Sequence, residues 1–364
     1  MTTNQSEKLE KLWFTRCPVP TATGLAYKLG WLTQEFARDK IALETLQDTP
    51  DLGHHHYDHQ LPSLIREGGN LLALPARAQG APTRLIGLTW IDEWQTILVR
   101  PGSDIREPKH LKNKRLALPG FNPVDLERNT RGRSIARGMS IAGYKGALAF
   151  AGLTLHDVKL VEIPSERQER NAGRRDGVAR LWTGLQSLID GTVDAVYVKG
   201  AAAVDSAKKF GAEVGINLDL LPDRRFRVNN GTPRPITAHE SLLENHFDLV
   251  VRFLDQTLRA ADWARDNRDD VRKILENETR GGPEGVITAY GENFHRSLHP
   301  DLSRERLELF RQQKDFLLIH GFLDRDFDYD AWVDARPLEA ALELRSARTS
   351  GKPRAESAAI SAAP

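Results

Sequence analysis

The stretch VRPGSDIREPKHLKNKRLAL, residues 99–118, joins two apolar runs that we predict to be strands, Gln95–Val99 and Arg115–Leu118. On both sides of it, further short apolar runs alternate with stretches of helical periodicity, which is typical of an α/β fold. The other predicted strands are Lys11–Thr15, Ile41–Thr45, Arg84–Trp90, Val158–Ile163, Ala195–Val198, Glu213–Ile216 and Arg225–Val228.

Helical periodicity lies between these strands and continues through most of the chain after about Ala238. The predicted helical segments are Thr23–Asp39, Ser134–Ala151, Val178–Asp190, Ala201–Phe210, Ser241–Asn277, Pro283–Phe294 and Ser303–His320. The last residues, 345–364, are rich in Ala, Ser, Arg and Pro, and this composition predicts a disordered tail.

The charge of the chain is balanced, with 51 Lys and Arg against 50 Asp and Glu in 364 residues. This length allows two lobes of ordinary domain size. The net charge of +1 gives no overall bias toward nucleic acid or an anionic membrane. We therefore expect a monomer with neither of these partners, in which a small anionic ligand is held by local donors.

The N-terminal sequence MTTNQSEK is polar, and no apolar signal-peptide segment follows it. No run approaches the roughly 20 apolar residues of a membrane span. We expect a cytoplasmic protein, because a single cysteine stays reduced in that compartment.

Residues 99–118 also resemble the segment by which periplasmic-binding-protein-like folds of the sulfonate- and nitrate-binding superfamily cross into their second lobe. The segment GTVDAVY, residues 191–197, resembles the Gly-x-Val-Asp-Ala motif of the same superfamily. The resemblance implies a type II fold of two α/β lobes with a ligand cleft between them. The first lobe is expected to span residues 10–100 and 225–340, and the second lobe residues 101–224.

Cys17 is the only cysteine of the chain and ends the first predicted strand, in LWFTRCPVP, residues 12–20. A lone thiol cannot form an internal disulfide, so Cys17 is a small buried residue, a residue without a role, or a nucleophile. Its position at a strand end, before a Pro-x-Pro turn, favours the nucleophile.

A histidine run, GHHHYDH, occupies residues 53–59. In a strand, His54 and His56 would point to one face and could share a ligand, whereas His55 would not. The spacing lacks the usual pattern of a zinc site, and we predict no metal. A metal site, a plain histidine-rich loop and a single catalytic histidine remain the alternatives from the residues alone.

An arginine followed by paired glycines forms the third motif, IREGGN, residues 65–70. Glycines can bring backbone N–H groups toward an anion while a guanidinium binds two of its oxygens. The alternative is an ordinary turn.

In this order, the three motifs resemble the 2'-hydroxybiphenyl-2-sulfinate desulfinase family of C–S-cleaving hydrolases. Residues 16–21 keep the Cys-Pro-Val-Pro core of the family's first motif, residues 54–58 match its His-Phe-Thr-Tyr-Asp, and residues 66–70 match its Arg-Phe-Gly-Gly-Glu. Residues 85–89, 290–294 and 313–318 resemble further segments of the family.

The resemblance implies a catalytic Cys17, a catalytic His54 and a sulfinate-binding Arg66, with Gly68 and Gly69 presenting backbone to the substrate. It implies release of sulfite from a small anionic, aromatic organosulfur substrate without a cofactor. Compared with the family pattern, two extra residues lie between Asp58 and Arg66, and histidines replace an aromatic residue and a threonine at positions 55 and 56. The pocket, including His56, should therefore be more polar than in the family.

Trp90 and Lys199 follow predicted strands, where this fold presents residues to its ligand, and both are expected to bind substrate. No nucleotide-binding glycine motif is present. The alternative function is a transporter's substrate-binding protein for a sulfonate- or nitrate-type anion. A further alternative is an enzyme of this fold that acts on another substrate, such as a pyrimidine-precursor synthase.

Overall fold

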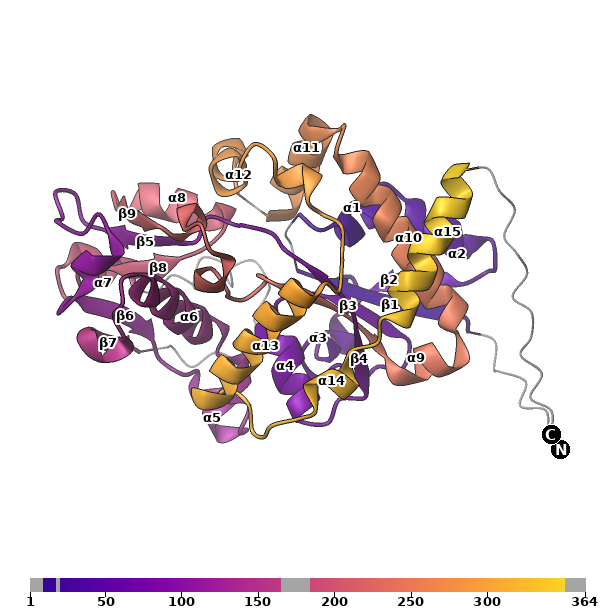
Figure 1. The fold of residues 1–364 in the computed structure, drawn as a ribbon, viewed down its shortest axis with the longest axis horizontal. Helices are drawn as coiled ribbons and strands as arrows, with labels where there is room; N and C mark the ends of the chain where they lie inside the picture. Colours follow the sequence, from indigo (N-terminus) through magenta and orange to yellow (C-terminus); the bar gives the residue numbers. More distant parts are fainter. Residues whose placement is uncertain (1–8, 18–19, 165–183, 280, 351–364) are drawn as a thin grey trace.

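The computed structural model describes residues 9–17, 20–164, 184–279 and 281–350, which form two groups of strands with helices around them (Figure 1). The first group is a five-stranded sheet with the strand order β2-β1-β3-β10-β4. Its strands are β1 (Lys11–Arg16), β2 (Ala42–Thr45), β3 (Leu64–Glu67), β4 (Thr83–Thr89) and β10 (Arg234–His239). β1 pairs in parallel with β2 and β3, whereas β10 runs antiparallel between β3 and β4. This sheet and its helices are the first lobe.

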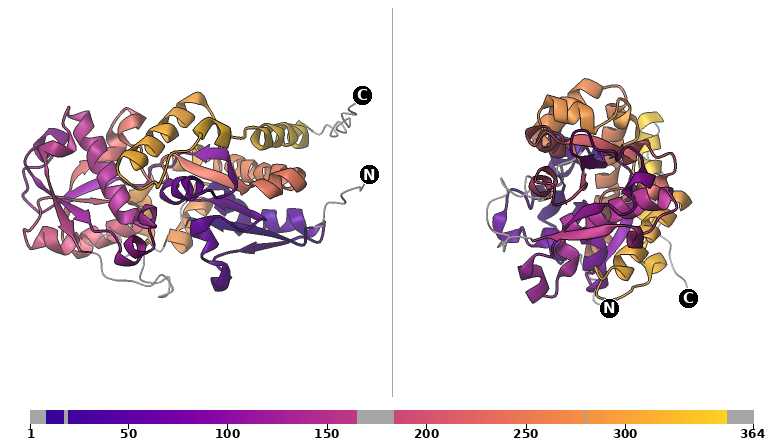
Figure 2. Two further views of the ribbon diagram at one scale, coloured as in Figure 1. Left: turned by 90° about the horizontal axis from the view of Figure 1, so that it is seen from below. Right: turned by 90° about the vertical axis from the view of Figure 1, so that its left-hand side faces the viewer.

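The second lobe contains the sheets β8-β5-β9 and β6-β7, on the left in Figure 1. A bridge between Leu116 and Ala195 joins them edge to edge. The strands are β5 (Thr96–Val99), β6 (Arg115–Pro119), β7 (Lys159–Ile163), β8 (Val196–Val198) and β9 (Glu213–Asn217). The two views of Figure 2 show helices beside the sheets of both lobes, as expected for the predicted α/β, periplasmic-binding-protein-like class.

Helices supply the remaining layers of both lobes. The second lobe has α5 (Pro123–Glu127), α6 (Ile135–Phe150), α7 (Leu185–Ile189) and α8 (Ala201–Lys209). The first half of the first lobe has α1 (Ala22–Lys28), α2 (Trp31–Ala37), α3 (His55–Asp58) and α4 (Asn70–Ala78). The C-terminal part adds α9 (Glu240–Asn245), α10 (Phe247–Ala264), α11 (Arg268–Thr279), α12 (Pro283–Ala289), α13 (Arg304–Ile319), α14 (Tyr329–Trp332) and α15 (Arg336–Ser350). The predicted helix Val178–Asp190 is described only from residue 184 onward, and residues 178–183 lie outside the described part of the chain.

Two segments connect the lobes, residues 90–95 and residues 218–233, and are called the first and the second crossing segment. The expected boundary after residue 100 is wrong for β5, because β5 pairs with β8 and β9 of the second lobe. The strand predicted at Arg225–Val228 is also wrong. Residues Arg224–Phe226 form a 3-10 turn that packs on α6, and the chain returns to the first sheet only at Arg234.

The predicted helix Thr23–Asp39 is two helices, because Gly30 lies between them with a φ of 75°. This left-handed conformation is easily adopted only by glycine. α1 and α2 then both pack on α10, which also contacts α15 (Figure 1). The apolar faces of these helices build the core of the first lobe around Phe14 and Phe253, whose ring centroids lie 5.4 Å apart.

The prediction of a disordered tail is wrong for its first residues, 345–350. Residues 345–350 belong to α15, while residues 351–364 lie outside the described part of the chain. α15 is fixed by charge, because Arg348 pairs with Asp255 at 2.5 Å and with Glu35 at 2.9 Å. The side chain of Asp255 is fully buried, so Arg348 belongs to a structural ion-pair cluster. The composition of residues 345–364 does not indicate this role.

Replacing Arg348 by methionine should lower the free energy of unfolding by about 1–3 kcal/mol. Breaking a fully buried pair costs roughly 3–5 kcal/mol, but Arg348 is 34% exposed and Asp255, whose pKa burial raises, can take up a proton. Urea unfolding measures the difference. The matched control is Arg304→Met, since Arg304 pairs with Glu308 on the surface, where such pairs are worth about 0–1 kcal/mol. Equal losses in the two variants would contradict the prediction.

Within the described residues, no helix combines the length and the apolar character needed to cross a membrane.

Candidate active site

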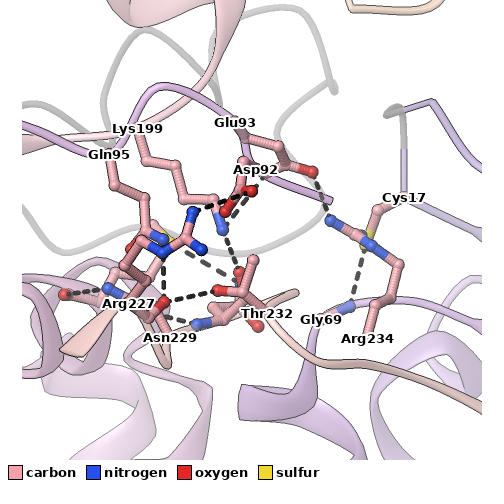
Figure 3. A network of polar contacts seen from close by, with 12 residues as sticks. Cys17, Gly69, Asp92, Glu93, Gln95, Lys199, Arg227, Asn229, Thr232 and Arg234 are labelled. Carbon is pink, nitrogen blue, oxygen red and sulfur yellow. Dashed lines mark hydrogen bonds and ion pairs between the residues drawn. The ribbon is translucent and has the colours of Figure 1, made fainter. Parts of the chain in front are cut away.

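Cys17 lies directly after β1, at the carboxyl ends of the parallel strands β1 and β3. Its backbone N–H donates to the carbonyl oxygen of Glu67 at 3.2 Å, which continues the pairing of the two strands by one residue. The thiol is partly exposed and unbridged. The backbone N–H of Gly69 donates to Sγ of Cys17 at 3.4 Å (Figure 3). Because Gly69 also caps the N-terminus of α4, a thiolate at Sγ would lie at the positive end of a helix dipole.

Arg66 lies in β3 and is 1% exposed. Its Nε donates to the carbonyl oxygen of His56 and its Nη2 to that of Gly69, both at 3.3 Å. The Nη1 of Arg66 is buried and has no hydrogen-bond partner within the described chain. Burial lowers the pKa of Arg66 to about 10, although the charge of Cys17 opposes this shift. A buried cation with an unused donor is suited to an anionic ligand.

The paired glycines leave space that side chains would fill. A Cβ atom on Gly68 would lie 2.6 Å from Nη2 of Arg66, and one on Gly69 would lie 2.1 Å from Oδ1 of Asn230. Both distances are shorter than any normal contact. Side chains at these positions would therefore displace the Arg66 guanidinium and the Asn230 amide from the places that they occupy.

A second guanidinium, that of Arg234, was missed by the sequence analysis. Arg234 is the first residue of β10 and is 2% exposed. Its Nη2 donates to Oε1 of Glu93 at 2.6 Å, and Figure 3 shows this pair beside Cys17. Burial opposes the charge of Arg234, but the charges of Glu93 and Cys17 outweigh burial and raise the pKa of Arg234. No local motif marks Arg234, because it joins the site through the long-range pairing of β10 with β3.

The structure does not bring His54 to this site. His54 is exposed, and its Nδ1 lies 3.1 Å from the carbonyl oxygen of Asp51. The physical reason is that residues 55–58 form a helical turn, so His54 and His56 do not share a face as they would in a strand. The turn directs His56 toward β1 instead, with its Nδ1 2.9 Å from Oγ1 of Thr15. Thr15 and Cys17 are two residues apart and share one face of the sheet, so His56 is the histidine of the run that lies on the Cys17 side.

His59 is the buried histidine of the run, at 1% exposure. Neither ring nitrogen forms a hydrogen bond of normal geometry within the described chain. Burial lowers the pKa of His59 well below its ordinary value of 6.5, and the charges of Arg66, His56 and Arg133 add to this effect. The ring is therefore neutral in the folded protein at neutral pH.

The burial of His59 in its neutral form predicts that the folded protein loses stability in acid. Below about pH 6.5 the unfolded chain binds a proton at His59 that the folded protein excludes, so the free energy of unfolding should fall by up to about 1.4 kcal/mol per pH unit. His59→Gln should remove this contribution, and urea unfolding at pH 7.5 and pH 5.5 measures it. The exposed His54→Gln is the matched control. The same pH dependence in wild type and His59→Gln would contradict the prediction.

The two further residues expected to bind substrate have different outcomes. Trp90 packs with Val228 and with Leu309 of α13, and its Nε1 donates to Oδ1 of Asp92 at 3.1 Å, so its described contacts lie on α13 and the crossing segments and not at Cys17. Lys199 does join the network near the site. Its Nζ donates to the carbonyl oxygen of Asn230 at 2.5 Å and lies 3.4 Å from Oε2 of Glu93 (Figure 3).

A separate group of possible metal ligands lies on the outer side of the histidine run. Ligand atoms of His54, His55 and Asp58 lie within 4.8 Å of one another. Nδ1 of His55 already pairs with Oδ1 of Asp58 at 2.9 Å. This group does not include Cys17, Arg66 or His56, so it gives no metal to the Cys17 site.

A surface pocket of about 440 Å³ lies between α6 and α13 and is lined by residues that include Lys145, Phe316 and His320. It shares no residue with the Cys17 site. The Cys17 thiol and the guanidiniums of Arg66 and Arg234 are therefore at the lobe boundary and not in this surface pocket.

The fold and the position of the site, at strand ends beside the crossings, define a protein of the periplasmic-binding-protein-like class. No family model matches the chain. The chain is 26% identical over 351 residues to the 2'-hydroxybiphenyl-2-sulfinate desulfinase of Rhodococcus erythropolis, covering 89% of this chain and 91% of that protein. The Rhodococcus qingshengii desulfinase matches equally well. The resemblance inferred from the motifs is thus confirmed over most of the chain.

Solved structures show the same fold. A cysteine-to-serine mutant of the enzyme DSZB, in complex with biphenyl-2-sulfinic acid, superposes with a TM-score of 0.71 at 22% identity, covering 92% of this chain and 99% of that one. The aliphatic sulphonate-binding protein SsuA of Escherichia coli superposes with a TM-score of 0.61 at 16% identity, covering 91% and 92%. The fold is therefore shared by an enzyme and by binding proteins, and the site has to distinguish them.

Proposed function

We propose that this protein is a desulfinase-like hydrolase that cleaves the C–S bond of an aryl sulfinate and releases sulfite. The observation that carries the proposal is the arrangement around Cys17, whose thiol receives the Gly69 N–H and has the buried guanidiniums of Arg66 and Arg234 near it. The match to curated desulfinases over 89% of the chain supports the same reaction.

The sulfinate would be held as an anion by Arg66. Nη1 of Arg66 is the buried donor without a partner, and a charge-assisted bond to a sulfinate oxygen would satisfy it. The aryl group would then extend away from the strand ends into the space between the lobes, with its sulfur next to Sγ of Cys17.

Hydrolysis replaces the sulfur on the ring carbon by a proton and adds water to the SO2 unit. As a nucleophile, the Cys17 thiolate would bond to sulfur while the C–S bond breaks and the ring carbon takes a proton, and water would then release bisulfite and the thiol. As an acid, the thiol would give its proton to the ring carbon, SO2 would leave, and its hydration would return a proton to the thiolate. Only the first route forms a covalent adduct.

His56 is assigned to proton transfer in either route, in place of His54. Its ring contacts Thr15 on the Cys17 face of the sheet, and its carbonyl oxygen fixes Nε of Arg66. Histidine titrates close to neutral pH, which suits a group that accepts and returns a proton.

The transporter-type binding protein is not better supported. A binding protein needs donors for an anion, but it does not need a thiol at the same point, and the curated matches are desulfinases. The cytoplasmic location, the monomeric state and the absence of nucleic-acid and membrane partners stay predictions.

The test is a sulfite assay of the purified protein with biphenyl-2-sulfinate, with biphenyl-2-sulfonate as the control compound. We expect stoichiometric sulfite and biphenyl from the sulfinate and neither product from the sulfonate. Binding of the sulfinate without turnover would overturn the enzyme proposal and favour the binding protein.

A further inference from the structure

We propose that Arg234 is a second sulfinate-binding residue and that Glu93, on the first crossing segment, holds its guanidinium in position. This inference rests on the proposed function and extends it, because the sequence motifs supply only one arginine. It also connects the binding of the anion to the contact between the two lobes.

The geometry of Arg234 is that of a group held for a ligand. Glu93 bonds only Nη2, and the Nε of Arg234 is buried without a hydrogen-bond partner in the described chain. A Cβ atom on Gly231 would lie 2.4 Å from Nη2, so the guanidinium is confined against the backbone of the second crossing. The charges of Arg234 and Cys17 interact, as do those of Arg234 and Arg66. Both guanidiniums therefore lie close enough to Cys17 for their charges to affect it.

The local charges do not balance without an anion. Arg66, Arg234 and Lys199 are all at most 6% exposed. Glu93 is shared between Arg234 at 2.6 Å and Lys199 at 3.4 Å. The other nearby carboxyl groups are Glu67 beside Arg234 and Asp219 beside Lys199, and burial raises the pKa of both, which weakens their negative charge. Buried cations in excess of their counter-ions are costly, and a bound sulfinate supplies the missing negative charge.

Glu93 also joins the lobes. Arg234 belongs to the sheet of the first lobe, Lys199 follows β8 of the second lobe, and Glu93 lies on the segment between them (Figure 3). The position of the Arg234 guanidinium thus depends on the contact of both lobes with Glu93. Glu93 and Lys199 act on the substrate only through Arg234, so they are positioning residues.

The experiment measures kcat and KM for sulfite release from biphenyl-2-sulfinate. Arg234→Gln should raise KM about 10- to 100-fold, the value of a lost charge-assisted hydrogen bond. Arg234→Lys should recover part of this loss, because it restores the charge. Glu93→Gln should raise KM less than Arg234→Gln and leave kcat within about threefold, because it releases the guanidinium without removing it.

The matched control is the neighbouring pair of Asp92 and Arg227, which joins the same two crossing segments at 3.0 Å. Asp92→Asn and Arg227→Lys should leave KM within about twofold, because neither residue has a described contact with Cys17, Arg66 or Arg234. If Arg234→Gln does not fold because Glu93 is left buried and unpaired, the double variant Arg234→Gln/Glu93→Gln removes both charges.

Wild-type KM in a folded Arg234→Gln variant or in the folded double variant would overturn the inference. Calorimetric titration with biphenyl-2-sulfinate separates this result from failure of the proposed function. A wild-type protein that binds the sulfinate but releases no sulfite refutes the enzyme and still tests Arg234, because loss of affinity in Arg234→Gln supports the role and unchanged affinity refutes it. A wild type that does not bind the sulfinate refutes both.

Discussion

Cys17→Ser should lower kcat for sulfite release by about 10³- to 10⁶-fold, the range seen when a reacting group is removed from a preorganised site. The hydroxyl of serine is a far weaker acid and a poorer nucleophile than a thiol, so the substitution disables both routes open to Cys17. The side chains are nearly isosteric and Cys17 is only partly buried, so the fold should be retained. Discontinuous sulfite assays on equal concentrations of folded protein give the ratio of rates.

The control for this variant is binding. Arg66 and Gly69 remain in Cys17→Ser, so calorimetry should show an affinity for biphenyl-2-sulfinate close to that of the wild type. Intact mass spectrometry of acid-quenched wild type separates the two routes, because only the nucleophilic route leaves an SO2 unit on the chain. Full activity in Cys17→Ser would remove the thiol from the reaction altogether.

Arg66→Gln should lower kcat/KM by about 10²- to 10³-fold, as expected when one preorganised donor to a developing anion is lost. Arg66 is buried between two carbonyl oxygens that it already bonds, so its remaining N–H groups have a fixed direction. Arg66→Lys keeps the charge but not the planar pair of donors, and it should fall between Arg66→Gln and the wild type.

Arg16→Lys is the matched control for Arg66. Arg16 ends β1, directly before Cys17, and is also buried, but it points to the opposite face of the sheet and pairs there with Glu278 at 2.5 Å. We expect a loss of stability in Arg16→Lys with kcat/KM of the folded protein within about threefold of wild type, because only that distant ion pair changes. Equal losses of kcat/KM in Arg16→Lys and Arg66→Lys would mean that sheet stability, and not anion binding, explains the effect of Arg66.

The parts of the site that could be predicted are carried by local patterns. Cys17 follows an apolar run and Arg66 precedes two glycines, and the parallel pairing of β1 with β3 then brings the two motifs to one edge of the sheet. The strand β1 and the helix α13 were predicted almost to the residue for the same reason, because their periodicity is uninterrupted.

The histidine that lies beside Cys17 could not be identified from a local sequence pattern. Neighbouring histidines give no pattern that separates His54 from His56, and the choice depends on whether the backbone turns helically or runs extended. The helical turn of α3 decides it and sends His54 to the surface.

Arg234 and Glu93 could not be predicted because neither lies in a recognisable element. β10 contains Pro235 and follows Pro233, and proline in a strand argues against a central position, yet β10 lies between β3 and β4. Its place is fixed by pairing over long sequence separation, which a local pattern does not contain.

The position of β10 between β3 and β4 also determines when the first sheet can be completed during synthesis. The strands of the second lobe, β5 to β9, leave the ribosome as one uninterrupted block, whereas the sheet that carries Cys17 has a gap between β3 and β4 until residues 234–239 emerge. The thiol is thus made early, and its cationic surroundings are completed late. A nascent chain halted before residue 234 would carry the cysteine with an unsealed sheet edge, so the reactive centre is assembled only after the other lobe has been made.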